Sequence, residues 1–513
     1  MKPNVLFIIL DTQRRDRLSL YDNRIETSPN LDEFAQNATI YERGIAPAQW
    51  TIPAHGSMFT GVYPTTHQLT QAYQKLSGSH PTLAEIMQMA DYHTVAFCNN
   101  PLLGLLDHDL QRGFDGFYNY AGAAPNRPAE KLNLPVLKQF KTQFRRFATF
   151  VTNQFANNDL MFRTATNPLL VPIWSRLVNF KGQTGRSIDD VISYWEQHNA
   201  GGADKPLFAF LNLMGTHTPY RPPNNHLDHV APNLRHDKQV RQFIADFNAN
   251  AADWLSPTEQ PLADWQHHAL NGYYDAEIAH QDVQLGRLFK YLKKSGALDD
   301  TLVIIAADHG EGHGDHNYMG HSFVVFQELV HVPLIVHYPE RFPAKRVTTN
   351  VSTRRIFHTV LDITQTQPPL AADDPNANVQ GLSLIKTLNG KPDTEGDVAY
   401  AEAFPPMTML NLLKRNKPQL IEDRQLTEVR RGVYDGDYKL ALVGDEVESL
   451  FDVAQDPAEV SDIAPNKPEI ATDLQYKLQA FVHQAQAQRL DGVQEGDVSA
   501  EVLENLQALG YID

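Results

Sequence analysis

Cysteine and long apolar segments are nearly absent from this sequence of 513 residues. Cys98 is the only cysteine, so no intrachain disulfide can form, which suits a reducing compartment. The apolar run near the N-terminus covers only residues 5–10 and ends at Asp11. A secretory signal needs an apolar core of about 7–15 residues, and a membrane span needs about 20. We therefore expect a cytoplasmic protein.

Positive charge is also scarce. The chain has 44 lysines and arginines against 61 aspartates and glutamates, which gives a formal net charge of -17. Binding to nucleic acid needs clustered basic side chains that contact phosphates, so we expect no nucleic-acid partner. Hydrophobic residues make up 42 % and charged residues 20 %, a globular composition with ample material for a large core.

The exception is a basic segment within residues 121–185, which we interpret as an insertion. From Arg127 to Arg186 the only acidic residues are Glu130 and Asp159, against ten basic ones. Its phenylalanines recur at helical spacing, at Phe140, Phe144, Phe147 and Phe150. Either this stripe packs on the domain, or it forms a helix that meets an anionic substrate or makes peripheral contact with an anionic membrane surface.

The order of apolar runs predicts an α/β fold with a large, mostly parallel sheet flanked by helices. Helical stretches separate short buried runs at residues 5–10, 94–97, 207–213, 302–306 and 332–336. Ligands of such sheets bind beyond the carboxyl ends of the strands, so Asp11 and Asp308 are expected to converge there. A proline-rich stretch near residues 364–378 separates a catalytic domain, residues 1–375, from a smaller C-terminal α+β subdomain, residues 376–513.

Three motifs carry candidate chemistry. Asp11 begins Asp-Thr-Gln after the first strand and either ligates a divalent metal or caps the next helix. Thr51 precedes Pro53 and is predicted to be the N-cap of a helix, where a hydroxyl lies among free N–H groups. Asp308 and His309 begin a glycine-rich loop after a strand and are plausible metal ligands, although clustered histidines are also common on surfaces.

Together the motifs resemble the sulfatase family of the alkaline phosphatase superfamily over nearly the whole chain. The match is carried by the order and spacing of the three motifs and of further segments at residues 28–32, 63–67, 212–220, 332–335, 450–452 and 456–457. Sulfatases carry Cys or Ser, oxidised to formylglycine, in a C/S-x-P-x-R motif. Here the motif is Thr51-Ile52-Pro53-Ala54-His55, and threonine cannot form that aldehyde.

The resemblance implies a site built around one divalent metal ion, Mn²⁺, Zn²⁺, Mg²⁺ or Ca²⁺. The expected ligands are Asp11, Thr51, Asp308 and His309, and Thr12 replaces the second acid of the sulfatase pair, so Gln13 is a further candidate ligand. Thr51 is the expected nucleophile, and His217 or His321 is expected to bind substrate or protonate the leaving group. The family's cationic clamp falls at His55, Asn99 and His321, and substrate contacts are expected from His55, Asn99 and Asn100.

These expectations favour a hydrolase of phosphate esters, diester or monoester, or a phosphoryl transferase that acts through Thr51. A sulfate-ester hydrolase without formylglycine is the first alternative, and a non-catalytic binding protein on the same fold is the second. The substrate is expected to be a small or lipid-linked anionic ester.

Overall fold

The computed structural model describes residues 2–21, 23–121, 125–128, 181–200, 204–250, 256–371, 374–389, 393–490 and 494–495. The predictions for the phenylalanine stripe, residues 140–150, and for most of the segment 121–185 lie outside these residues. Within them, no helix combines the length and apolar character that crossing a membrane requires.

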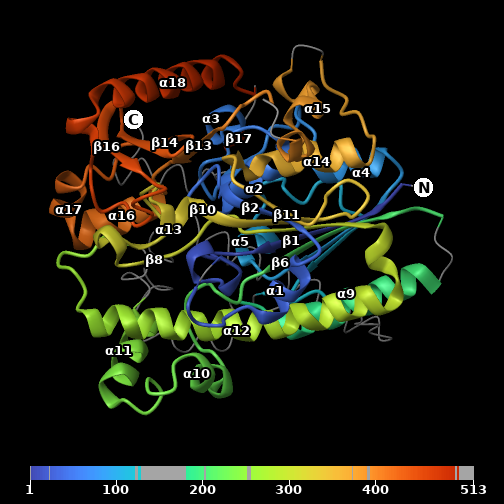
Figure 1. Cartoon of the computed structure of the whole chain (residues 1–513), viewed down its shortest axis with the longest axis horizontal. Coiled ribbons are helices and arrows are strands. Elements are labelled where there is room, and N and C mark those ends of the chain that lie inside the picture. Colours follow the sequence, from blue (N-terminus) through green and yellow to red (C-terminus); the bar gives the residue numbers. More distant parts are fainter. Residues whose placement is uncertain are drawn as a thin grey trace.

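A nine-stranded sheet forms the centre of the molecule (Figure 1). Its order is β11 (Lys345–Val347), β2 (Thr39–Ile45), β10 (His331–His337), β7 (Thr301–Ala306), β1 (Asn4–Leu10), β6 (Leu207–Leu213), β4 (His93–Cys98) and β5 (Gly116–Asn119), with β12 (Val351–Ser352) beside β2. The five strands β7, β1, β6, β4 and β5 run parallel to one another, whereas β10 is antiparallel to both of its neighbours, β7 and β2. The prediction of a mostly parallel α/β sheet is confirmed.

Both faces of the sheet are covered, which explains why its strands are continuously apolar. Alternate residues of β1 serve two cores. Leu6, Ile8 and Leu10 pack with α1 (Pro29–Ala35), α9 (Thr184–Ala200) and α12 (Asp264–Ser295). Val5, Phe7 and Ile9 pack with α2 (Thr51–Thr60), α4 (Leu83–Met89) and α14 (Ile356–Ile363) on the other face (Figure 1).

The C-terminal part forms a smaller, antiparallel sheet, as predicted for an α+β subdomain. Its strands are β13 (Val398–Ala403), β14 (Arg430–Asp435), β15 (Tyr438–Val443) and β16 (Glu446–Asp452). Helix α18 (Pro468–Ala487) packs on one face through Leu474 and Leu478. Alternate residues on the other face pack with α16 (Met407–Asn416), α17 (Pro418–Asp423) and the catalytic domain.

The chain has further short helices and strands outside these two sheets. They are α3 (Pro64–His67), α5 (Pro101–Leu105), α10 (Asn224–Val230), α11 (Lys238–Ala249), α13 (Gln327–Val330), α15 (Val379–Leu382) and the short strands β3 (Gln74–Lys75), β8 (Gly312–His313), β9 (Met319–Gly320) and β17 (Gln494–Glu495). Residues just beyond the predicted boundary at 375, such as Val379 and Leu384, pack in the core of the catalytic domain. The boundary itself stays a prediction.

Candidate metal centre and active site

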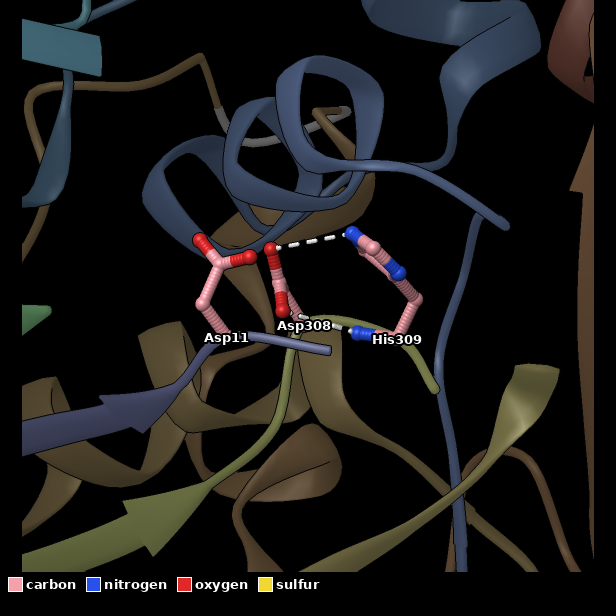
Figure 2. A group of neighbouring side chains, drawn as sticks. All are labelled: Asp11, Asp308 and His309. Atoms are coloured by element: carbon pink, nitrogen blue, oxygen red, sulfur yellow. Dashed lines mark hydrogen bonds and ion pairs between the residues drawn. The ribbon is translucent and has the colours of Figure 1, made fainter. Parts of the chain in front are cut away.

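The polar ends of neighbouring strands meet beside the start of α2. Asp11 directly follows β1, and Asp308 follows β7, which pairs with β1. Asn212 lies in β6 on the other side of β1, and Asn100 follows β4. Because side chains alternate along a strand, Asp11 shares a face with Val5, Phe7 and Ile9, the face that α2 covers. The predicted convergence of Asp11 and Asp308 is therefore observed (Figure 2).

The carboxyl group of Asp11 is fully buried and only half satisfied. Its Oδ2 accepts hydrogen bonds from Asn100 Nδ2 at 2.7 Å and from Asn212 Nδ2 at 3.0 Å. Its Oδ1 has no hydrogen-bond partner in the part of the chain that the structure describes. Burial raises the pKa of Asp11 even though both amides stabilise the charged form. These contacts show a side chain turned toward the strand ends, which removes the alternative that Asp11 merely caps a helix.

Asp308 repeats this pattern. Its Oδ1 accepts the backbone N–H groups of Thr12 at 3.2 Å and of His309 at 3.0 Å, whereas its buried Oδ2 has no hydrogen-bond partner. Burial, together with the neighbouring carboxyl of Asp11, raises the pKa of Asp308 well above its usual range. Buried polar atoms are almost always hydrogen-bonded, so two orphaned carboxylate oxygens side by side require an explanation. A divalent cation between them supplies one.

The ring of His309 turns a nitrogen that can bind a metal ion toward the two acids. Its Nδ1 donates to the carbonyl of Gly310 at 2.9 Å, so Nε2 carries the lone pair. That Nε2 lies 3.4 Å from Asp308 Oδ2, and burial lowers the pKa of the ring well below its usual value. A neutral imidazole is the form that binds metals. Ligand atoms of Asp11, Asp308 and His309 all lie within 4.8 Å of one another (Figure 2), so the residues fit the predicted metal ion.

Thr51 places a hydroxyl against this cluster. Its Oγ1 lies 3.4 Å from His309 Nε2 and 3.5 Å from Asn100 Nδ2. The prediction that Thr51 is an N-cap is wrong by one residue, because the helix begins at Thr51 and Trp50 is the cap. The hydroxyl faces the side chains of His309 and Asn100. It still lies at the positive end of the dipole of α2, which favours a negatively charged oxygen.

His55 lies one turn further along α2 and lines the same cluster. Its Nδ1 is 2.9 Å from the carbonyl of Thr51 and 3.5 Å from Asp308 Oδ2, and its buried Nε2 has no hydrogen-bond partner. Burial lowers the pKa of His55 to about 4. The ring is therefore neutral near pH 7, unlike the arginine that sulfatases carry at this position.

Two further histidines extend the site away from the acids. The ring of His321 lies 4.5 Å from that of His309 and 5.2 Å from that of His217. Burial disfavours a charge on His321, but Glu311, at 2.8 Å from its Nδ1, outweighs this and raises its pKa. Burial and then the nearby His321 lower the pKa of His217 to about 4. The structure thus brings together Asp11, Thr51, His55, Asn100, His217, Asp308, His309 and His321.

The described side-chain hydrogen bonds of Asn99 and Gln13 go to residues outside this cluster. Asn99 follows the alternation of β4 to the other face, where its Oδ1 accepts the hydroxyl of Ser187 at 2.5 Å. Gln13 is buried, its Nε2 donates to the carbonyl of Arg14 at 2.9 Å, and its Oε1 has no partner. Substrate contact by Asn99 and metal ligation by Gln13 stay predictions.

Sequence reasoning assigned no role to Asn212 or Glu311. Asn212 donates to Asp11 and Glu311 holds His321, so both orient residues that were predicted. Asn212 could have been identified in the sequence as the one polar side chain in the apolar run of residues 207–213. Other histidines have ordinary structural contacts: His67 Nε2 lies 3.0 Å from the Ser57 hydroxyl, and His316 lies at the contact with the C-terminal subdomain.

The sequence and the fold of this chain are similar to those of known proteins over most of its length. The model of the sulfatase family matches residues 3–366. An arylsulfatase of Clostridium perfringens is 22% identical over 427 residues, which cover 78% of this chain and 82% of that protein. The "multifunctional alkaline phosphatase superfamily protein PehA" of Trinickia caryophylli is 22% identical over 499 residues, 90% of this chain and 91% of that protein. The crystal structure of a phosphonate monoester hydrolase of Agrobacterium radiobacter superposes with a TM-score of 0.66 at 22% identity, covering 94% of this chain and 96% of that chain.

Proposed function

Because this chain belongs to the sulfatase family, we propose that it is a metal-dependent hydrolase that cleaves phosphate esters, diester or monoester, or transfers a phosphoryl group through Thr51. The observation that carries the proposal is the Thr51 hydroxyl, 3.4 Å from the metal-binding nitrogen of His309. The relatives it matches are hydrolases of sulfuric and phosphoric esters, which argues against a non-catalytic binding protein.

The residues divide the reaction between them. A divalent cation, when bound, favours ionisation of a hydroxyl and neutralises charge on a phosphate oxygen. Asp11, Asp308 and His309 would hold that cation. Thr51 Oγ1, after its proton has left to solvent, forms a bond to phosphorus while the bond to the leaving oxygen breaks. His321 lies beside His309 and His217 beside His321, and one of these two histidines, in its protonated form, gives the leaving oxygen its proton. Water then attacks the phosphothreonine, returns a proton to that histidine and releases Thr51.

The same residues favour phosphorus over sulfur as the reacting centre. Threonine cannot yield formylglycine, and neutral His55 stands where sulfatases have an arginine. A dianionic phosphate gains more from a cation and a helix N-terminus than a monoanionic sulfate does. One observation supports the alternative of a sulfate-ester hydrolase: arylsulfatases are among the relatives that match most of the chain.

A matched substrate panel tests the proposal. Metal-free protein is loaded in turn with Mn²⁺, Zn²⁺, Mg²⁺ or Ca²⁺ and assayed on the phosphate monoester, phosphate diester, phosphonate monoester and sulfate ester of 4-nitrophenol. We expect kcat/KM for at least one phosphorus ester to exceed that for the sulfate by about 10-fold or more, or about 1.4 kcal/mol. A sulfate ester that is cleaved faster than every phosphorus ester would establish the alternative.

A further inference from the structure

The loop between β6 and α10 carries His217 and determines where that ring lies in the candidate site. On the inner side of the loop, the Thr216 hydroxyl donates to the Asp11 carbonyl at 2.6 Å. The next residue is His217, whose ring lies 5.2 Å from that of His321. The groups that hold this loop therefore decide how the two histidines stand relative to each other and to the acids.

Helix α12 holds the loop on both sides of His217. Before it, Gln281 Oε1 accepts the backbone N–H of Gly215 at 3.0 Å. After it, Glu277 Oε1 accepts the backbone N–H of Arg221 at 2.7 Å. Glu277 and Gln281 are four positions apart in α12, so they project from the same face of the helix. One face of α12 thus fastens both ends of the loop.

Lys181 connects this face of α12 to the middle of the loop. Its Nζ donates to Glu277 Oε1 at 3.0 Å and to the Pro219 carbonyl at 3.1 Å. The Glu277 side chain is only 7 % exposed, and a buried carboxylate needs a cation nearby. A single ammonium group therefore stabilises Glu277 and also binds the loop two residues after His217.

The turn that presents Lys181 is itself anchored. It lies at the end of the basic segment 121–185, just before α9. Gly182 has a φ of 63°, which suits glycine, and a Cβ there would lie 2.9 Å from Asn99 Cγ. The Ser187 hydroxyl donates to the Oδ1 of the same Asn99. The start of α9 is thus held against the end of β4, and Lys181 reaches the loop from a fixed point.

We propose that Lys181 and Glu277 are positioning residues for His217. They act through the loop, without touching the ester, and keep His217 beside His321 while the leaving oxygen receives its proton. Loss of their ion pair should then impair most the esters whose leaving oxygen depends most on that proton. The protonation step rests on the proposed function, whereas the attachment of the loop can be measured without turnover.

The first test compares two leaving groups. The metal-loaded full chain is assayed on the phenyl and 4-nitrophenyl esters of whichever acid the substrate panel shows to be cleaved. Phenolate is the more basic leaving group and needs the proton more. We expect Lys181→Met to lower kcat about 10-fold for the phenyl ester and less than about 3-fold for the 4-nitrophenyl ester.

Two further variants separate positioning from a general loss of structure. Lys181→Arg keeps a positive charge and several donors, so it should retain most of the wild-type kcat with both esters. Lys477→Met removes a lysine of α18 that is ion-paired with Asp435, away from the candidate site. It is the matched control and should leave the ratio of the two kcat values unchanged.

The second test follows the loop without a substrate. Amide hydrogen exchange of residues 214–221 is measured in the same proteins. We expect Lys181→Met to speed this exchange by about 10-fold or more, because the loop loses its attachment to α12. Lys477→Met should keep the wild-type rate.

Equal losses of kcat with the two esters, or no loss, would overturn the positioning role. If Lys181→Met does not fold, Glu277→Gln breaks the same ion pair, keeps an acceptor for the Arg221 N–H group and gives the same comparison. Faster exchange in a protein that cleaves no ester would leave the attachment of the loop standing and overturn the proposed function, together with the catalytic part of the proposal. Cleavage of phosphorus esters with exchange and leaving-group ratio unchanged in Lys181→Met would overturn the proposal alone.

Discussion

Two clusters of buried charged side chains differ in how completely their polar atoms are hydrogen-bonded or ion-paired. At the metal centre, Asp11 and Asp308 each leave one oxygen without a hydrogen bond. At the contact between the catalytic domain and the C-terminal subdomain, Lys439 Nζ lies 2.5 Å from Glu459 Oε1 and donates to the Val325 carbonyl at 2.6 Å. Glu459 Oε2 also accepts the backbone N–H of Gln327 at 2.7 Å.

His316 joins this second group, which we name the junction cluster: His316, Glu328, Lys439 and Glu459. The ring of His316 lies 3.1 Å from Glu328 Oε1 and stacks on Phe326 at 3.9 Å between centroids. None of the polar atoms of the junction cluster is among the unsatisfied buried atoms of the described residues. Burial of charge alone therefore does not mark a functional site. The metal centre differs in having two neighbouring buried carboxyl groups that each keep an oxygen without a hydrogen bond among the described residues, whereas a protein that needs only stability pairs its buried charges.

The largest expected effect is at the metal centre. Thr51→Ala removes the proposed nucleophile and should lower kcat by about 10³-fold or more, because the covalent intermediate forms on the Thr51 hydroxyl. Thr60→Ala, in the same helix, makes the same chemical change away from the cluster and should retain activity. The measurement is kcat at saturating metal, together with metal content. A metal-loaded Thr51→Ala protein with most of the wild-type kcat would contradict the assigned role.

At the junction the expected effect is on stability. Lys439→Met leaves the Glu459 carboxylate buried without its cation, which should cost about 3–5 kcal/mol of unfolding free energy. The double variant Lys439→Met/Glu459→Leu should recover most of that loss, since neither charge remains. Urea denaturation measures both, and metal content per folded protein should stay at the wild-type value. If the folded Lys439→Met protein lost its metal, the junction cluster would affect metal binding as well as stability, which contradicts the separate roles of the two clusters.

Neutralising an acid should have the opposite sign at the two clusters. In chelator-treated protein at pH 8, Asp308→Asn removes one of two adjacent buried carboxyls, so the unfolding free energy should rise by about 1–2 kcal/mol. Glu459→Gln should lower it, because the change leaves the buried Lys439 ammonium without its carboxylate partner, even though burial raises the pKa of Glu459. Asp308→Asn should at the same time lose metal binding. A metal-free Asp308→Asn protein that is less stable than wild type would show that the site is not strained by its acids.

The smallest effect concerns pH. Burial disfavours a charged His316, but Glu328 and Glu459 outweigh it and raise its pKa to about 9. Since this lies above the usual 6.5, the stabilisation is complete below pH 6.5 and is lost as pH rises toward 9. His316→Gln should therefore lower stability by about 1–2 kcal/mol at pH 6, after allowance for partial exposure, and by little above pH 9. Melting temperatures across this range check it; a constant difference between the proteins would contradict the pKa argument.

The sequence was sufficient to predict those features that follow from chain geometry. Parallel strands end at one edge of a sheet, so acids that follow two apolar runs had to meet there, and Asp11 and Asp308 do. The helix at Thr51 was predicted with its start one residue late, because Thr51 has the composition of a cap while its hydroxyl faces His309. The preference of threonine for N-cap positions carries no information about the contact between Thr51 and His309.

Contacts between distant side chains could not be predicted in this way. Asn99 and Asn100 look equivalent in the sequence, yet strand alternation places Asn99 beside Ser187 and Asn100 beside Asp11. The junction cluster joins residues about 140 positions apart, and its pairing depends on how the two sheets pack. No local sequence pattern identifies such partners, whereas the acids at the strand ends are identified by the apolar runs that precede them.

The position of β7 in the sheet has a consequence for the order of events in the cell. This strand lies between β1 and β10 and delivers Asp308, almost 300 residues after Asp11. A growing chain therefore displays Asp11 and Thr51 long before it possesses their partners. Until a central strand has been synthesised and inserted, none of the early residues can trap a cation with the geometry described. Metal uptake must follow the insertion of β7 beside β1, and a fragment that ends before residue 308 cannot acquire the ion by this route.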